Sequence, residues 1–114
     1  MKMLERAELT ETERLAVEEA ARRVKSELPV ARVILFGSKA RGSSGADSDI
    51  DLLILTSEPV TTELRRAISD RLFEVSLDRN VALASVVTSE TDWSEGLTRH
   101  TLLHSEVERD GCEI

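Results

Sequence analysis

The chain has 114 residues, of which 40% are hydrophobic and 32% are charged. This length suits one domain, and the composition is that of a globular protein rather than of a disordered or membrane-spanning one. With 15 Lys and Arg against 22 Asp and Glu, the net charge is −7, so non-specific binding to nucleic acid or to an anionic membrane is not expected. The single cysteine, Cys112, excludes an internal disulfide, and the first residues lack the apolar run of a signal peptide. Together these features predict a cytoplasmic location.

The first predicted elements are a helix and a strand. Thr10 and Glu13 have the spacing of a capping box, and small and branched apolar residues follow at helical intervals up to Pro29. We therefore expect a helix from about 11 to 28. Residues 30–36 are mostly branched or aromatic and stop at Gly37, which predicts a buried strand.

The remaining elements follow a polar loop over 37–49. The patterns predict a strand at 50–55, a helix from about 61 to 77 and a third strand at 81–87. They then predict a polar turn at 88–92, a helix at about 97–109 and a short terminal strand. This order predicts an α/β (or α+β) fold in two layers, a small mixed sheet with helices on one face. We expect a single domain over 1–114, with a helical N-terminal segment at about 10–28 and a core at about 30–114.

Two carboxylates stand at the start of the second predicted strand. Side chains alternate along a strand, so Asp49 and Asp51 should point to the same side, about 7 Å apart along it. Two adjacent carboxylates at a buried strand end are costly unless a cation neutralises them, and such hard oxygen ligands suit Mg²⁺. The alternative is two solvated acids at a frayed strand end.

The turn after the first strand has the features of a phosphate-binding site. Gly37 would let backbone N–H groups approach a ligand closely, and Ser38 could cap a short helix. Lys39 and Arg41 add positive charge beside this turn in an otherwise acidic chain. The alternatives are a tight turn that needs glycine for its conformation and two solvated surface cations.

Taken together, these residues resemble a known family. Residues 37–42 read G-S-K-A-R-G and, after five more residues, 48–52 read S-D-I-D-L. This pairing resembles the signature of the minimal nucleotidyltransferases of the DNA polymerase β superfamily. The resemblance extends from about residue 30 to the C-terminus, where 105–111 resemble the charged helix end and glycine that close many small members.

The resemblance implies transfer of a nucleoside monophosphate, most plausibly AMP from ATP, to an acceptor. Asp49 and Asp51 would be the catalytic residues and would hold two Mg²⁺ ions about 4 Å apart. Four further motif residues would bind the nucleotide: Gly37, Ser38, Arg41 and Ser48.

One departure from the family concerns a third carboxylate. Active members generally carry one on the following strand, but residues 81–87 read V-A-L-A-S-V-V. Asp47, Asp78 or no residue at all could complete the site. A chain with an incomplete site would bind nucleotide poorly and react slowly.

The family also implies partners. Small members are commonly paired with HEPN-domain proteins in toxin–antitoxin modules, where the nucleotidyltransferase is the antitoxin. A chain this small lacks an acceptor-binding domain of its own, so we expect a partner chain or a homodimer. The alternative function is a catalytically weak or inactive protein that neutralises its partner by binding. A small-molecule nucleotidyltransferase is less favoured, because its acceptor would need a second domain.

Two other features have simpler explanations than a functional site. His100 and His104 are four residues apart on a predicted helix, but no acid or thiol at matching spacing completes a metal site, which favours a helix surface. Trp93 has few aromatic neighbours and is expected to anchor a core or an interface.

Overall fold

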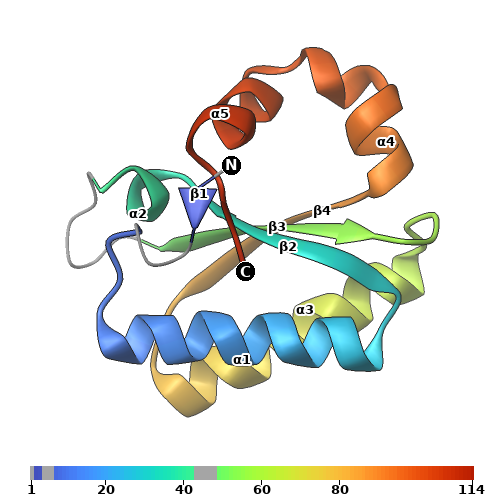
Figure 1. Ribbon diagram of the computed structural model, residues 1–114. Coiled ribbons are helices and arrows are strands. Elements are labelled where there is room, and N and C mark those ends of the chain that lie inside the picture. Colours follow the sequence, from blue (N-terminus) through green and yellow to red (C-terminus); the bar gives the residue numbers. More distant parts are fainter. Residues whose placement is uncertain (1, 4–6, 43–48) are drawn as a thin grey trace.

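The computed structural model describes residues 2–3, 7–42 and 49–114. Within these ranges a five-stranded sheet, in the order β1-β5-β2-β3-β4, has helices on both faces (Figure 1). The strands are β1 (Lys2–Met3), β2 (Val30–Phe36), β3 (Ile50–Thr56), β4 (Leu83–Ser89) and β5 (Cys112–Glu113). The helices are α1 (Glu11–Glu27), α2 (Ser38–Arg41), α3 (Thr62–Arg79), α4 (Glu90–Glu95) and α5 (Leu102–Asp110), with a 3₁₀ helix, η2, at Leu97–His100.

The sheet is mixed, and the predicted α/β class is confirmed. β2 runs antiparallel to both β3 and β5, whereas β4 runs parallel to β3 and β1 runs parallel to β5. The parallel pair is joined by α3, which crosses from the end of β3 to the start of β4. A helix is the usual connection between parallel neighbours, because the chain must return to the same end of the sheet.

Helices α1 and α3 cover one face of the sheet. Their buried side chains form a single cluster with alternate residues of β3, namely Ile50, Leu52 and Ile54. From the helices this cluster includes Ala16, Val17, Ala20, Ala21, Val24, Leu64, Ile68, Leu72 and Val75. This layer is the main core and agrees with the predicted packing of the first two long helices.

The opposite face is also covered, which corrects the expectation that all helices lie on one face. Leu53 and Leu55 of β3 pack there with Trp93 of α4 and Val107 of α5 (Figure 1). A strand that is buried on both faces has apolar side chains on both sides. Residues 50–55 have this pattern apart from Asp51, so the sequence does contain a signal for the second covered face. Trp93 is 5% exposed, so its predicted role as a core anchor is confirmed.

The C-terminal third differs from prediction in its boundaries. The third strand was expected at 81–87 but runs from 83 to 89, because Val81 belongs to the turn after α3 and donates its N–H to the Ser76 carbonyl. The predicted turn at 88–92 is wrong: Ser89 accepts a hydrogen bond from the Asp92 N–H and thereby caps α4. The predicted helix at 97–109 is η2 followed by α5.

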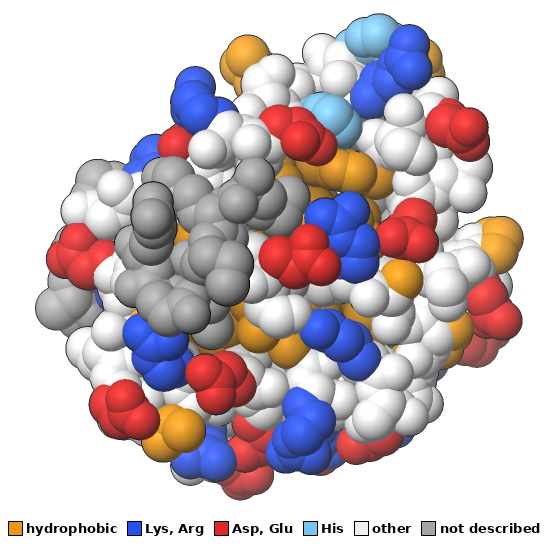
Figure 2. All heavy atoms as spheres, viewed as in Figure 1, with side chains coloured by type: hydrophobic (Ala, Val, Ile, Leu, Met, Phe, Trp, Pro, Cys, Tyr) orange, Lys and Arg blue, Asp and Glu red, His pale blue; other side chains and the backbone are white. Residues whose placement is uncertain are grey.

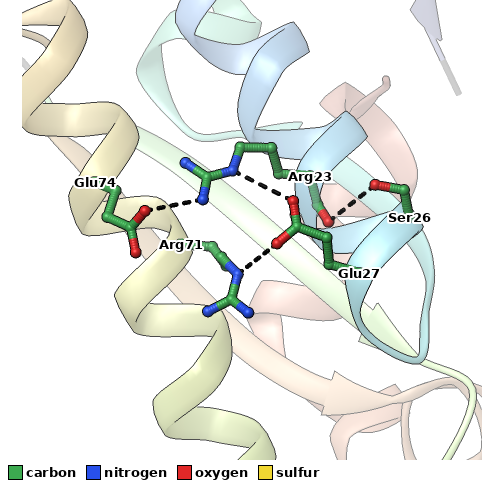
Figure 3. Close-up of polar contacts among 5 residues, drawn as sticks. All are labelled: Arg23, Ser26, Glu27, Arg71 and Glu74. Carbon is green, nitrogen blue, oxygen red and sulfur yellow. Dashed lines mark hydrogen bonds and ion pairs between the residues drawn. The ribbon is translucent and has the colours of Figure 1, made fainter.

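Ion pairs join α1 to α3 on the outer surface of the main layer (Figure 3). Arg23 lies between two carboxylates, 2.9 Å from Glu74 and 3.6 Å from Glu27. Glu27 in turn accepts a hydrogen bond of 2.7 Å from Arg71. Exposed pairs of this kind contribute little individually, so the apolar layer beneath them holds the helices together.

Across the part of the chain that the structure describes, no helix is both long and apolar enough to cross a membrane.

Candidate functional site

The site is built at the start of β3. Asp51 is the second residue of this strand and is half-buried, whereas Asp49 immediately precedes the strand and is exposed. Asp51 lies two residues before Leu53, so strand alternation places it on the face covered by α4 and α5. Asp49 is two residues before Asp51, so the same alternation places it on the same face of the sheet.

The two carboxylates interact electrostatically. Burial raises the pKa of Asp51 above its usual value, and the negative charge of Asp49 raises it further. The guanidinium of Arg41 opposes both effects and lowers this pKa. A cation bound between two nearby carboxylates, one of them partly buried, would stabilise their charged forms.

The turn after β2 brings Gly37 against Asp51. Phe36 is the register partner of Asp51 across the antiparallel β2–β3 pair, so the next residue, Gly37, lies beside the carboxylate. Gly37 has φ 78° and ψ −158°, a combination essentially restricted to glycine. A Cβ built at this position would overlap Oδ2 of Asp51. Glycine is therefore required both by the backbone conformation and by the space.

Helix α2 follows directly and presents the other motif residues. Ser38 is its first residue, and the Arg41 N–H donates to the Gly37 carbonyl at 3.1 Å. Gly42, with φ 76°, ends the helix in the left-handed conformation. Arg41 is exposed on the last turn, close enough for its charge to act on Asp51. Of the predicted site residues, Gly37, Ser38, Arg41, Asp49 and Asp51 are thus brought to one end of the sheet.

Lys39, expected as a positive charge beside the turn, is buried in an ion pair with α1. Its ammonium lies 2.8 Å from Oε2 of Glu13, and the two side chains are only 5% and 13% exposed. Glu13 also accepts a hydrogen bond of 2.9 Å from the Thr10 N–H through Oε1. The sequence identified Glu13 as a capping residue but carried no signal that it would also pair with Lys39. This ion pair fastens α2 to the start of α1.

The strand beside β3 carries no carboxylate toward the site. Ala84 is the parallel register partner of Asp51, and the Ile50 N–H donates to the Ala82 carbonyl at 2.9 Å. Parallel partners share a face, so the side chains nearest the two aspartates on this strand are methyl groups.

The candidates for a third carboxylate do not complete the site in the described ranges. Asp78 lies on α3, which packs on the other face of the sheet. Asp47 and Ser48 lie outside the described residues. Among the residues that are described, no three His, Cys, Asp or Glu side chains gather as a set of metal ligands. The chemistry of the donors nevertheless fits Mg²⁺, which binds one or two carboxylates and keeps several waters.

The two histidines lie in different environments. His104 stacks on Trp93 with ring centroids 4.4 Å apart, and this contact joins α5 to α4. His100 is exposed on η2, where its Nε2 accepts a hydrogen bond of 3.3 Å from Arg99. His100 thus lies on a helix surface as expected, whereas the expectation is wrong for His104, which is half-buried against Trp93.

The surface shows no broad basic patch on the face in view. Lys and Arg side chains are interspersed with Asp and Glu side chains across it (Figure 2). This mixture of charges is consistent with the net charge of −7.

Comparison with known proteins identifies the family to which the chain is similar. The sequence model of the nucleotidyltransferase domain matches residues 17–98, a range that contains every predicted site residue. A protein of Methanocaldococcus jannaschii, named "Putative protein adenylyltransferase MJ0141", is 34% identical over 83 residues, which are 73% of this chain and 77% of that protein.

Solved structures share the fold at low sequence identity. A chain of a toxin–antitoxin crystal structure with AMP-PNP matches with a TM-score of 0.59 and 16% identity, covering 84% of this chain and 69% of that one. A chain from a tri-AMPylated Shewanella oneidensis HEPN toxin in complex with MNT antitoxin matches with a TM-score of 0.54 and 16% identity. That match covers 88% of this chain and 69% of the other.

Proposed function

The chain belongs to the nucleotidyltransferase domain family, and on this premise we propose that it transfers AMP from ATP to a partner protein in a Mg²⁺-dependent reaction. The observation that carries the proposal is the arrangement of Asp49 and Asp51 at the start of β3, with Gly37 packed directly against Asp51. The similarity to a protein named as an adenylyltransferase supports AMP as the group transferred.

Each residue has a distinct role in this proposal. Asp49 and Asp51 would hold Mg²⁺, which when bound would neutralise charge on the phosphates during an in-line displacement. Gly37 and Ser38 bind the β- and γ-phosphates through backbone N–H groups and the hydroxyl. Arg41 and Ser48 are assigned to nucleotide binding from their place in the motif.

The reaction in this chain depends mainly on positioning. The turn between β2 and α2 would hold the phosphates beside the two carboxylates, so that the acceptor oxygen attacks the α-phosphorus opposite the leaving pyrophosphate. In the described part of the chain, Ala82 and Ala84 stand where a third carboxylate would help to remove the acceptor proton. We therefore expect slow turnover.

The proposed acceptor is a HEPN-domain toxin, with this chain as its antitoxin. The fold is shared with chains from toxin–antitoxin structures, one of which contains an AMPylated HEPN toxin. The cytoplasmic location and the single-domain organisation over 1–114 stay predictions from the sequence.

The second candidate function is neutralisation by binding alone. The alanines opposite the two aspartates favour it, because they remove the group that would complete the catalytic site. In this case the partner would be masked without being modified.

The test is co-expression of the chain with a HEPN protein from the same genome, followed by intact mass measurement of the HEPN protein. The proposal predicts a mass increase of one or more AMP groups. Asp49→Asn and Asp51→Asn should each abolish it. Asp78→Asn is the matched control, because it makes the same chemical change across the sheet and should leave modification intact.

The same strains separate the two functions. If the Asp49→Asn and Asp51→Asn variants lose both modification and rescue of growth from the toxin, the enzymatic function is supported. If they still rescue growth, and no AMP is found on the HEPN protein with the wild-type chain, the binding function replaces it.

A further inference from the structure

The feature that no catalytic role explains is the free edge of β4. This strand is at the end of the sheet order and pairs with β3 alone in the described ranges. It spans seven residues, L-A-S-V-V-T-S, with no charge and no proline. Proteins usually protect such an edge with charged residues, proline or a bulge, because its unpaired N–H and C=O groups can pair with another strand. Because β4 lacks these devices, its edge is open to pairing with another strand.

An exposed apolar side chain of α3, Phe73, lies beside this edge, and Leu77 is exposed one turn further along the same helix. Phe73 is 63% exposed and Leu77 is 67% exposed, although both lie on a helix that packs on the main core. A groove of about 390 Å³ separates α3 from β4, and Phe73, Leu83 and Ser85 are among its lining residues. On the other side of the sheet, Val86 of β4 is 38% exposed. The free edge is therefore flanked by apolar surface on both faces of the sheet.

The edge can pair with a copy of itself. In an antiparallel pairing about a two-fold axis perpendicular to the sheet, each β4 faces the other, and each α3 lies beside the other on the same face. Because β4 carries no charge, no like charges meet wherever the axis crosses the strand. The polar and small residues of β4 also leave room for close approach.

The charges on α3 are compatible with the same symmetry. Asp70 is the one charged residue that lines the groove among the described residues. An axis passing near Phe73 would keep the two Asp70 positions about six residues apart along the antiparallel helices, which is about 9 Å of helix rise. The two Phe73 side chains would then meet at the centre and bury the apolar surface.

The far edge of the sheet explains why the pairing would stop at two copies. That edge is β1, which has two residues, Lys2–Met3. A strand this short offers too few hydrogen bonds to recruit another sheet. Pairing through β4 thus closes a dimer rather than starting a fibre.

From these observations we propose that two copies of this chain form a symmetric dimer through the edge of β4 and the Phe73–Leu77 side of α3. The sheets of the two copies join into one continuous sheet. This dimer does not depend on nucleotide transfer, so it can fail while the proposed function holds.

The test is the molar mass of the purified chain in solution, measured by light scattering after gel filtration over a range of concentrations. The wild type should have twice the mass of one chain. Val86→Lys places a charge on the edge, and Phe73→Glu places one on α3; each should give the mass of one chain. Leu102→Lys is the matched control, because Leu102 is 84% exposed on α5, away from this surface, and this variant should stay dimeric.

Two results would overturn the proposal. One is a wild-type chain that has the mass of a single chain at every concentration. This is also the result expected if the surface binds a different protein and not a second copy. The other is that both single variants, Phe73→Glu and Val86→Lys, stay dimeric. Since Phe73 is largely exposed, Phe73→Glu should fold, and an unchanged circular dichroism spectrum would establish this independently of the mass.

Discussion

Gly37 is the residue in which the requirements of the backbone and of the site coincide. Its φ of 78° with ψ of −158° is strained for any residue with a side chain. The space its hydrogen faces is filled by the Asp51 carboxylate. The same close approach would let a phosphate reach the backbone N–H groups of the turn.

We predict that Gly37→Ala destabilises the fold by about 1–3 kcal/mol and weakens nucleotide binding. The added methyl group must displace Asp51 as well as strain the backbone. Chemical denaturation and calorimetric titration with ATP and Mg²⁺ measure the two effects.

Gly42→Ala is the control for this change. Gly42 also has a positive φ, 76°, but a Cβ there meets Glu8 rather than Asp51. This variant should lose stability while keeping nucleotide binding. Unchanged binding in Gly37→Ala would contradict the role given to this turn.

At the scale of elements, the Glu13–Lys39 pair links α2 to α1. Burial alone would raise the pKa of Glu13, but the hydrogen bonds from Lys39 and from the Thr10 N–H outweigh it and hold the pKa below the usual 4.5. An acid whose pKa is lowered by folding stabilises the fold above its unfolded pKa. That contribution is lost as the pH falls through the lower, folded pKa, and so it disappears below about pH 4.5.

We predict that Glu13→Gln lowers the free energy of unfolding by about 1–3 kcal/mol at pH 7. The difference from wild type should shrink as the pH falls below 4.5, the ordinary pKa of this group. Denaturation at several pH values measures it.

Two further variants serve as comparisons for Glu13→Gln. Lys39→Met should cost less than Glu13→Gln, because the charge that it leaves, on Glu13, is less buried than Lys39 and still accepts a hydrogen bond from the Thr10 N–H. Glu18→Gln, an exposed position on the same helix, should change stability little. A Glu13→Gln variant as stable as wild type at pH 7 would show that the pair does not fasten α2.

Prediction from sequence succeeded where one local signal dominated. The capping box at Thr10 and the apolar run of 30–36 fixed α1 and β2 almost to the residue. It failed where tertiary contacts decided: Ser89 was expected in a turn but ends β4 and caps α4, and the burial of Trp93 draws α4 onto the second face. Lys39 is a further case, because no pattern in the sequence places it beside Glu13.

For the molecule as a whole, the candidate site could be predicted because its residues are close in sequence. Gly37 directly follows β2, and Asp51 lies on β3, the antiparallel neighbour of β2, so residues of one sequence motif meet in space. The free edge of β4 could not be predicted in this way, since it depends on the order of strands in the sheet. Sequence periodicity gives strands but not their neighbours.

The central claim is that Asp49, Asp51 and the Gly37 turn form a site for nucleotide and Mg²⁺. The most direct measurement is calorimetric titration of the wild type and of an Asp49→Ala/Asp51→Ala double variant with ATP, with and without Mg²⁺. Asp78→Ala serves as the control. We predict Mg²⁺-dependent binding in the wild type and the control, weakened at least about tenfold, or by about 1.4 kcal/mol, in the double variant. Equal binding by the double variant, or no binding by the wild type with Mg²⁺ present, would contradict the account.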